Sequence, residues 1–120
     1  MSYIFCTIND ITLENNLAMA FFDKFPVTNG HLLIIPKRHV EHYFDLTSEE
    51  KQAMDDLLLQ GKELLDHQFN PDGYNIGINN GEAAGQTIFH VHVHLIPRYK
   101  GDMKEPRGGV RGVIPEKRMY

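Results

Sequence analysis

Two apolar runs early in the chain predict a pair of neighbouring strands. Leu17–Phe22 is bounded by polar residues on both sides, which is typical of a buried strand with polar ends. His31–Ile35 ends at Pro36, which has no backbone N–H and cannot continue a central strand. A loop with turn-forming residues joins the two runs, so we expect a hairpin that brings Asp23 and His31 close together at one end of the sheet.

The longest predicted element is a helix that starts at Thr47. The stretch Thr47-Ser48-Glu49-Glu50 has the pattern of a capping box, in which Thr and Glu each satisfy the backbone N–H of the other. Apolar residues then recur at helical spacing, and Pro71 predicts that the helix ends near Asn70. Gly61 within this stripe costs roughly 1 kcal/mol relative to alanine, so we expect the helix to pack closely on a sheet there. The stripe consists of Met54, Leu57, Leu58, Gly61, Leu64 and Leu65.

Two segments in the second half of the chain alternate between apolar and polar residues, as half-buried strands do. In Tyr74–Asn79, large apolar residues alternate with asparagine and glycine, which leaves one face small and polar. In Phe89–Arg98, the histidines His90, His92 and His94 occupy every second position and share one face, while valine and leucine share the other. We therefore expect one face of this strand to pack and the other to carry chemistry.

The loop between these two strands, residues 80–87, is rich in small residues that leave backbone N–H groups accessible. Asn79 ends the preceding strand with both a donor and an acceptor, and Gln86 and Thr87 add side-chain donors just before His90. Such a loop suits an anion that is held by neutral dipoles.

Length and composition predict a single domain over residues 1–120 that folds without disulfides. There is no run of about 18 apolar residues that could cross a bilayer, and no basic-then-apolar start typical of a signal peptide. The one cysteine, Cys6, cannot form an internal disulfide, which suits a reducing cytoplasm. The net charge of −4 argues against broad binding to nucleic acid or to anionic membranes, so an anion site must be a local pocket.

The two ends of the chain show weaker patterns. Ile4–Ile8 is mostly apolar and predicts a short extended or irregular segment. Residues 101–120 combine basic residues with glycines and show no periodicity, which predicts an irregular C-terminal extension. A solvated extension is the default expectation for such a tail, and the alternative is that it covers a partner subunit or steers phosphates.

Three histidines in register on one strand face can be purely structural, but their repetition favours a site. His-x-His is a common metal-ligand spacing, and the alternative is a nucleophilic histidine with histidine and amide neighbours. A nucleophilic histidine must be neutral, with an acceptor that holds the proton on its other ring nitrogen. His92, the central residue, would be this nucleophile, while His90 and His94 would orient it and offer protons. Amide groups and Gln86 would then stabilise the developing charge.

The stretch His90-Val91-His92-Val93-His94-Leu95-Ile96 resembles the signature of the histidine-triad (HIT) family of nucleotide hydrolases and transferases. The resemblance also covers the spacing from Asp23 to His31, the Ile-Pro after the second strand, Asn79-Asn80-Gly81 and Gly85-Gln86-Thr87, and so extends over about residues 4–100. It implies an α+β fold with an antiparallel sheet of about five strands and one long helix. It also implies a homodimer in which the sheets of the two copies join.

The resemblance implies attack on the α-phosphorus of a nucleotide, a nucleotidyl-histidine intermediate and release of a nucleoside monophosphate. The flanks of the signature are similar to those of the fragile-histidine-triad branch, which cleaves dinucleoside polyphosphates; a nucleoside phosphoramidate hydrolase and a nucleotide-binding signalling module are the alternatives. The implied site residues are the catalytic His92, His90, His94 and His31, with Asp23 at the ribose hydroxyls and Asn79, Gln86 and Thr87 at the phosphate and leaving group.

The resemblance also bears on metal binding. Some bacterial members of the family carry a Cys-x-x-Cys near the amino terminus that contributes to a zinc site. Here Tyr3 takes the first position and only Cys6 remains. We therefore expect neither a metal nor another cofactor, and a small-molecule nucleotide as the ligand.

Overall fold

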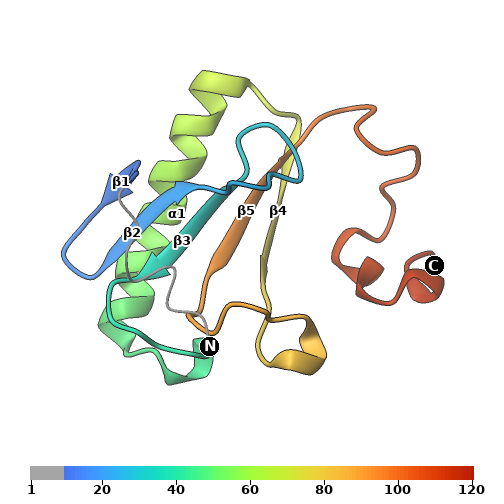
Figure 1. Cartoon of the computed structure of the whole chain (residues 1–120). Coiled ribbons are helices and arrows are strands. Elements are labelled where there is room, and N and C mark those ends of the chain that lie inside the picture. Colours follow the sequence, from blue (N-terminus) through green and yellow to red (C-terminus); the bar gives the residue numbers. More distant parts are fainter. Residues whose placement is uncertain (1–9) are drawn as a thin grey trace.

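The computed structural model describes residues 10–120 as a five-stranded antiparallel sheet with one long helix on it (Figure 1). The strand order in the sheet is β1-β2-β3-β5-β4, and neighbouring strands are antiparallel. This arrangement confirms the predicted α+β fold. The elements are β1 (Leu13–Glu14), β2 (Ala18–Phe22), β3 (Leu32–Pro36), α1 (Ser48–Phe69), β4 (Gly73–Ile78) and β5 (Val93–Arg98), with short 3-10 helices η2 (Tyr43–Asp45), η3 (Glu82–Ala84), η4 (Gly109–Val113) and η5 (Pro115–Lys117).

The predicted hairpin forms from β2 and β3, in a register that pairs Ala18 with Pro36 and Phe22 with Leu32. Pro36 is the last residue of β3, as its missing N–H requires. The two-residue strand β1 was not predicted, because two residues are too few to show alternation. The segment predicted at Ile4–Ile8 lies outside the described residues.

The histidine strand begins later than the alternation predicts. β5 starts at Val93, so the prediction of a strand from Phe89 is wrong for its first four residues. The register that pairs Ile34 with Val93 would place Pro36 opposite Val91, and proline has no N–H to offer the ladder. The Val91 N–H instead donates to the carbonyl of Val40 at 2.7 Å.

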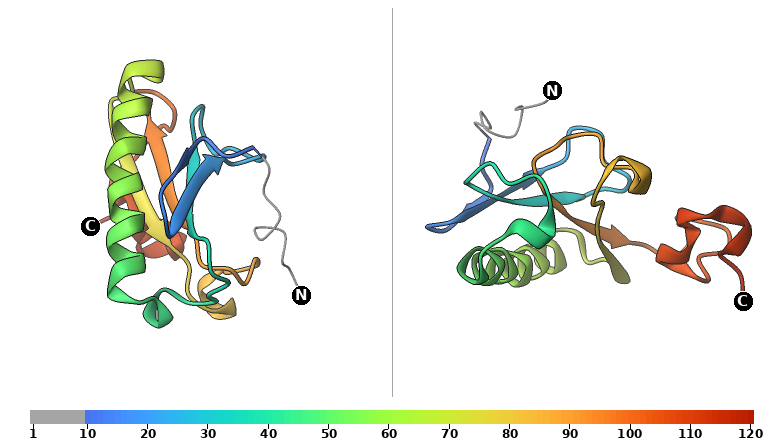
Figure 2. Two further views of the ribbon diagram at one scale, coloured as in Figure 1. Left: turned by 90° about the vertical axis from the view of Figure 1, so that its left-hand side faces the viewer. Right: turned by 90° about the horizontal axis from the view of Figure 1, so that it is seen from below.

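Helix α1 covers one face of the sheet and leaves the other face without a helix (Figure 2). Its buried side packs on Leu32 and Ile34 of β3 and on Val93 and Leu95 of β5. Leu33, which pairs with His94 across the strands, belongs to a second apolar cluster together with Phe21 and Ile35. Because side chains alternate along a strand, His94 points to the face opposite the helix. Among the described residues, no helix combines the length and apolar character needed to span a bilayer.

The helix begins and ends as the sequence predicts. Thr47 and Glu50 form the capping box, and Asn70 ends the helix in the left-handed conformation before Pro71. Gly61 is buried against the sheet, where an added Cβ would lie 2.8 Å from Leu32 Cδ2 and 3.3 Å from Leu95 Cδ2. The close approach expected at Gly61 is therefore present.

Glu50 also forms an ion pair with Arg38, which joins the start of α1 to the segment after β3. The carboxylate is buried and accepts from Arg38 Nε at 2.9 Å and from Nη2 at 2.7 Å. This hydrogen bonding to Arg38 lowers the pKa of Glu50 to about 2. One carboxylate thus caps the helix and holds the segment that carries Val40.

We expect Glu50→Gln to destabilise the fold by about 2 kcal/mol, because it removes a charge-assisted pair and leaves Arg38 without its anion. Urea unfolding followed by circular dichroism measures this loss. Glu49→Gln, at an exposed position in the same helical turn, is the control and should change stability by less than about 0.5 kcal/mol. Equal stabilities of the two variants would show that the ion pair contributes nothing.

Candidate functional site

The candidate site lies on the helix-free face of the sheet, where His31, just before β3, lies beside His94 in the first half of β5. The ring centroids of His92 and His94 are 4.9 Å apart, and those of His31 and His94 are 5.2 Å apart. Asp23 follows the end of β2 and reaches the same group, with its Oδ2 3.7 Å from His31 Nε2. The predicted meeting of Asp23 and His31 at one end of the sheet is present, and His94 joins them.

His92 is held in one orientation by the backbone carbonyl of His90. Its Nδ1 lies 2.9 Å from the carbonyl oxygen of His90, which can only accept, so Nδ1 carries the proton. In the neutral ring, Nε2 then carries the lone pair. The side chain is 9% exposed. The structure thus supplies the acceptor that a nucleophilic histidine requires.

His90 is placed differently from the other two histidines. Its side chain is fully buried, and its Nε2 lies 2.8 Å from the carbonyl oxygen of Pro36. Its ring packs edge-on against the ring of His39 at 5.0 Å between centroids. His90 precedes the strand and contacts Pro36 and His39, whereas the rings of His92 and His94 pack on each other. Val91, Val93 and Leu95 lie together in the core on the helix side of the sheet, as the alternation predicts.

His31 and His94 form a hydrogen-bonded chain whose direction is set by a backbone amide. Val27 N–H donates to His31 Nδ1 at 3.0 Å, so this nitrogen must be an acceptor. A neutral His31 consequently carries its proton on Nε2, which lies 2.9 Å from His94 Nδ1. His94 accepts that hydrogen on Nδ1 and carries its own proton on Nε2. His94 is therefore a neutral hydrogen-bond donor on the site side.

Asp23 fixes the loop that approaches the site. Its Oδ1 accepts from the Phe25 N–H at 2.9 Å, while its Oδ2 is the oxygen near His31. The side chain is 19% exposed. Asp23 and His31 thus each bond the backbone of the loop at residues 25–27, so the loop and the two side chains form one unit.

Within residues 10–120, one group brings together three possible metal ligands: Asp23, His31 and His94, with ligand atoms within 4.8 Å of one another. A metal would need the lone pair of His31 Nε2. The Val27 N–H already takes the lone pair of His31 Nδ1, which leaves the proton on Nε2. The hydrogen bonding of this group therefore does not suit a metal ion. Tyr3 and Cys6, on which the expectation about zinc depends, lie outside the described residues.

The loop at residues 80–87 holds Gln86 inside the protein. Its Oε1 accepts from the Gly81 N–H at 2.8 Å, and its Nε2 donates to the carbonyls of Glu41 and Ile88. Both Nε2 hydrogens are therefore used within the protein, and Gln86, predicted at the phosphate, instead orders the loop. Asn79 is partly buried directly after β4, and Thr87 is exposed.

Space for a ligand is open beside His94. Gly77 on β4 pairs with His94 across the strands. A Cβ added to Gly77 would meet no heavy atom within 4 Å. A glycine at this position therefore leaves room next to the histidine ring, as the small, polar face of the Tyr74–Asn79 strand suggests.

Burial keeps the histidines of the site neutral. It is the largest cause that lowers the pKa of His31, His90, His92 and His94 below the ordinary value of 6.5. The pKa of His94 falls to about 4, because His92 and His31 also disfavour a second positive charge. At neutral pH the site therefore presents uncharged imidazoles, as the tautomers above require.

The partners that hold the histidines are backbone groups; sequence reasoning required an acceptor for the nucleophile but did not identify the residues that supply these groups. They are the N–H of Val27 and the carbonyls of Pro36 and His90. A backbone group has no residue-type signal, because every residue carries it. Pro36 was the one available signal. It ends a strand, so its carbonyl is free to bond a side chain, here His90.

Comparisons with known proteins match residues 7–101 to the HIT domain family. An uncharacterised 16.1 kDa HIT-like protein of Mycoplasma pneumoniae is 40% identical over 87 residues, which cover 72% of this chain and 60% of that protein. The bis(5'-nucleosyl)-tetraphosphatase (asymmetrical) of Schizosaccharomyces pombe is 37% identical over 97 residues, 81% of this chain and 53% of that protein. The bis(5'-adenosyl)-triphosphatase of Dictyostelium discoideum is 39% identical over 99 residues, 80% of this chain and 64% of that protein.

Among solved structures, a crystal structure of a HIT family protein from Bacillus anthracis matches with a TM-score of 0.78 and 40% identity, over 82% of this chain and 74% of that one. The sheet and helix described above are thus shared with an experimentally determined fold. This chain spans between about half and two thirds of the length of the three relatives named above.

Proposed function

Because this chain belongs to the HIT domain family, we propose that it is a nucleotide hydrolase in which His92 attacks the α-phosphorus of its substrate. The observation that carries this proposal is the bond from His92 Nδ1 to the His90 carbonyl, which leaves the nucleophilic lone pair on Nε2. The depressed pKa of His92 adds to it, because a protonated ring cannot attack.

The reaction proceeds in two in-line displacements. In the first, a bond forms between His92 Nε2 and the α-phosphorus, and the bond from that phosphorus to the leaving group breaks. In the second, water attacks the phosphorus, His92 departs with its lone pair, and the proton that the water loses passes to solvent. The products are a nucleoside monophosphate and the leaving group. No step requires a metal held by the protein.

The other site residues position the substrate and stabilise charge. His94 donates a hydrogen bond from Nε2 to a phosphate oxygen, and His31 holds it in the tautomer that can do so. Asp23 accepts from the ribose hydroxyls, while Asn79 and Thr87 contact the phosphate and leaving group. Gln86 acts through the loop it orders, and His90 through the carbonyl that orients His92.

We propose dinucleoside polyphosphates as the substrate class. The names of the relatives from Schizosaccharomyces pombe and Dictyostelium discoideum support this class, since both describe enzymes that cleave bis-nucleosyl polyphosphates. We propose further that residues 1–120 work as a single HIT domain with residues 101–120 as its extension, in a cytoplasmic homodimer whose sheets join. These last points rest on the family resemblance and on the single cysteine.

The test is to incubate the protein with diadenosine tetraphosphate or with an adenosine phosphoramidate and to measure AMP release. Rapid quenching without acid, followed by intact mass spectrometry, should reveal an adduct of one AMP. AMP release from the dinucleotide supports dinucleoside polyphosphates as the substrate class. AMP release from the phosphoramidate alone would instead favour the phosphoramidate hydrolase. Tight nucleotide binding without an adduct and without AMP release would refute the proposed hydrolase activity and favour a nucleotide-binding module.

The pH dependence of the reaction should reflect the depressed pKa of His92. The neutral fraction of a histidine decreases as the pH falls through its pKa. Because the pKa of folded His92 lies below 6.5, the ring stays neutral to a lower pH than an ordinary histidine does. We therefore expect the acid limb of kcat/KM, measured with the dinucleotide, to have its midpoint below pH 6.5. A midpoint at or above 6.5 would contradict a buried, neutral nucleophile.

A further inference from the structure

The loop between β2 and β3, residues 23–31, supplies the N–H group on which two histidines of the site depend. Val27 N–H donates to His31 Nδ1 at 3.0 Å, and His31 Nε2 lies 2.9 Å from His94 Nδ1. The Val27 side chain is 68% exposed, so its own packing does not hold this N–H in place. Other contacts of the loop must therefore fix the position of the donor.

Two side-chain hydroxyls fasten this loop to the end of β5. The backbone pairing of β3 with β5 reaches only as far as Leu32. Beyond it, Thr28 Oγ1 donates to the carbonyl of Pro97 at 2.5 Å. The hydroxyl of Tyr99 donates to the carbonyl of Asn29 at 2.6 Å. One bond starts from the loop and the other starts from the residue after β5, so together they hold the loop at two neighbouring points.

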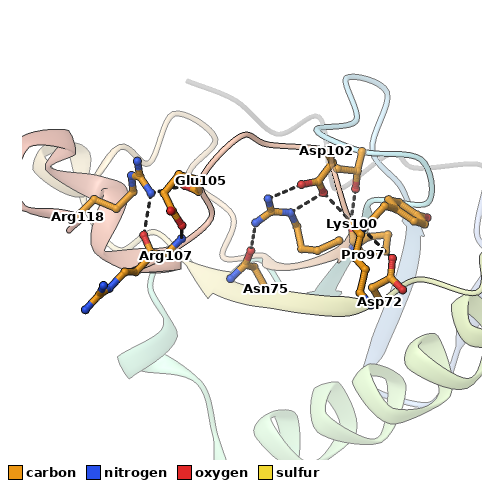
Figure 3. A network of polar contacts seen from close by, with 11 residues as sticks. Asp72, Asn75, Pro97, Lys100, Asp102, Glu105, Arg107 and Arg118 are labelled. Atoms are coloured by element: carbon orange, nitrogen blue, oxygen red, sulfur yellow. Dashed lines mark hydrogen bonds and ion pairs between the residues drawn. The ribbon is translucent and has the colours of Figure 1, made fainter. Parts of the chain in front are cut away.

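Tyr99 is itself held in place by the turn that follows β5. Asp102 Oδ2 accepts from the Tyr99 N–H at 2.9 Å and from Arg98 Nε at 2.8 Å. Asn75 Oδ1 on β4 accepts from the same guanidinium at 2.7 Å, and Figure 3 shows Asp102 and Asn75 meeting there. Burial raises the pKa of Tyr99, so the phenol keeps its proton and stays a donor. The bond from Tyr99 to the loop therefore starts from a fixed base.

The loop is limited from the helix side by packing. Gly30 has a φ of +92°, and a Cβ added there would lie 3.0 Å from Phe69 Cδ2 and 3.2 Å from Leu65 Cδ2. The ring of Phe69 also meets the ring of Phe22 edge-on, at 6.5 Å between centroids. This packing restricts movement of the loop toward α1, while the two directional hydroxyl bonds set its position along β5.

The hydrogen bonds between His31 and His94 can run in two directions, and only one of them suits a phosphate. With the Val27 N–H in place, His31 carries its proton on Nε2, and His94 carries its proton on the nitrogen that faces the site. Without that N–H, His31 could carry its proton on Nδ1, and His94 would have to donate from its own Nδ1 to His31 Nε2. His94 would then present a lone pair to a phosphate oxygen instead of a hydrogen.

We propose that Thr28 and Tyr99 are positioning residues of the hydrolase, whose hydroxyls hold the loop so that Val27 selects the productive direction of the histidine bonds. Both act through His31 on His94. The kinetic consequence rests on the proposed function, whereas the direction of the bonds is a property of the protein without substrate. The two hydroxyl bonds join residues 69 and 70 positions apart, so no local pattern in the sequence marks either residue.

The first experiment compares Thr28→Val/Tyr99→Phe with the wild type in steady-state hydrolysis of diadenosine tetraphosphate. Both changes remove a hydroxyl and keep a side chain of similar shape. We expect kcat to fall at least tenfold, because a misplacement of about 1 Å can cost about a hundredfold in rate. The Michaelis constant should change by less than about threefold, since the other contacts to the substrate remain. A folded double variant with the kcat of the wild type would overturn the proposal.

Two single variants serve as controls for the kinetics. Thr28→Ser keeps the hydroxyl, so it should retain wild-type turnover where Thr28→Val does not. Tyr74→Phe removes a hydroxyl that bonds Asp66 on α1 at 2.7 Å, and it should leave kcat and KM unchanged. Tyr99→Phe alone provides the same test if the double variant does not fold. A loss of turnover in Thr28→Ser equal to that in Thr28→Val would refute a role of the hydroxyl.

The second experiment determines the histidine tautomers without substrate. Long-range proton–nitrogen correlation spectra of isotope-labelled protein distinguish a proton on Nδ1 from one on Nε2, with the signals of His31 and His94 assigned by single substitutions. We expect protons on Nε2 of both rings in the wild type and in Tyr74→Phe, and a substantial population with protons on Nδ1 in the double variant. Unchanged tautomers in the folded double variant, or a wild-type His31 protonated on Nδ1, would overturn the proposal. A wild type that shows the expected tautomers but releases no AMP would instead refute the hydrolase.

Discussion

Replacement of His92 by alanine should lower dinucleotide hydrolysis by about 10⁴-fold or more while nucleotide binding persists, as is typical for removal of a catalytic nucleophile. The loss follows from the geometry, because the His90 carbonyl and the ring of His94 serve to orient a nitrogen that would no longer be present. Binding depends on other groups, Asp23 among them, so the dissociation constant should change by less than about tenfold.

Steady-state AMP release and calorimetric titration with a nonhydrolysable dinucleotide measure the two quantities for His92→Ala. His67→Ala, at an exposed position in the last turn of α1, is the control and should retain wild-type turnover. A His92→Ala protein with nearly normal turnover would exclude the covalent route. In that case another group must attack, or the observed hydrolysis comes from a contaminant.

Gly61→Val is expected to destabilise the protein by about 3 kcal/mol, because overpacking of a core costs about 1–3 kcal/mol and valine adds a branched side chain. Even a Cβ at this position would lie 2.8 Å from Leu32 Cδ2, and Leu32 is fully buried. The helix would have to move away from β3 and β5, and the gain in helix propensity over glycine, about 0.5 kcal/mol, does not offset that cost.

The measurement is the midpoint of urea unfolding, combined with AMP release from the folded protein. Gly73→Val is the matched control, since an added Cβ at Gly73 meets no heavy atom within 4 Å. That variant should stay within about 0.5 kcal/mol of the wild type. If Gly61→Val proves equally stable, the helix is free to shift over the sheet, and close packing at Gly61 is not required.

The elements that local sequence rules govern were predictable. The capping box at Thr47 and the proline at position 71 set the limits of α1, because both act within a few residues of the chain. The start of β5 was not predictable, since it depends on the register between β3 and β5 and on the place of Pro36 in it. The register depends on how two strands pair, so the alternation within one strand cannot predict it.

The same distinction applies to the site. Spacing predicted that His92 lies near His94 and that Asp23 lies near His31, and the family resemblance joined the two pairs into one site, as the structure does. Neither spacing nor resemblance distinguished side chains that face the site from side chains whose hydrogen bonds hold the surrounding loops in place. Gln86 was predicted as a phosphate donor, yet its amide is used up by the carbonyls of Glu41 and Ile88. Such partners come from distant loops and leave no trace in the local pattern.

The hydrogen bonds from Val27 through His31 to His94 all point the same way. Each donor polarises the next, so the three dipoles add, with the positive end at His94 Nε2. In the proposed reaction, negative charge that develops on the phosphate oxygens would meet a field that is already aligned before the substrate binds. The source of that alignment is a peptide N–H in a surface loop, which acts on His94 through His31.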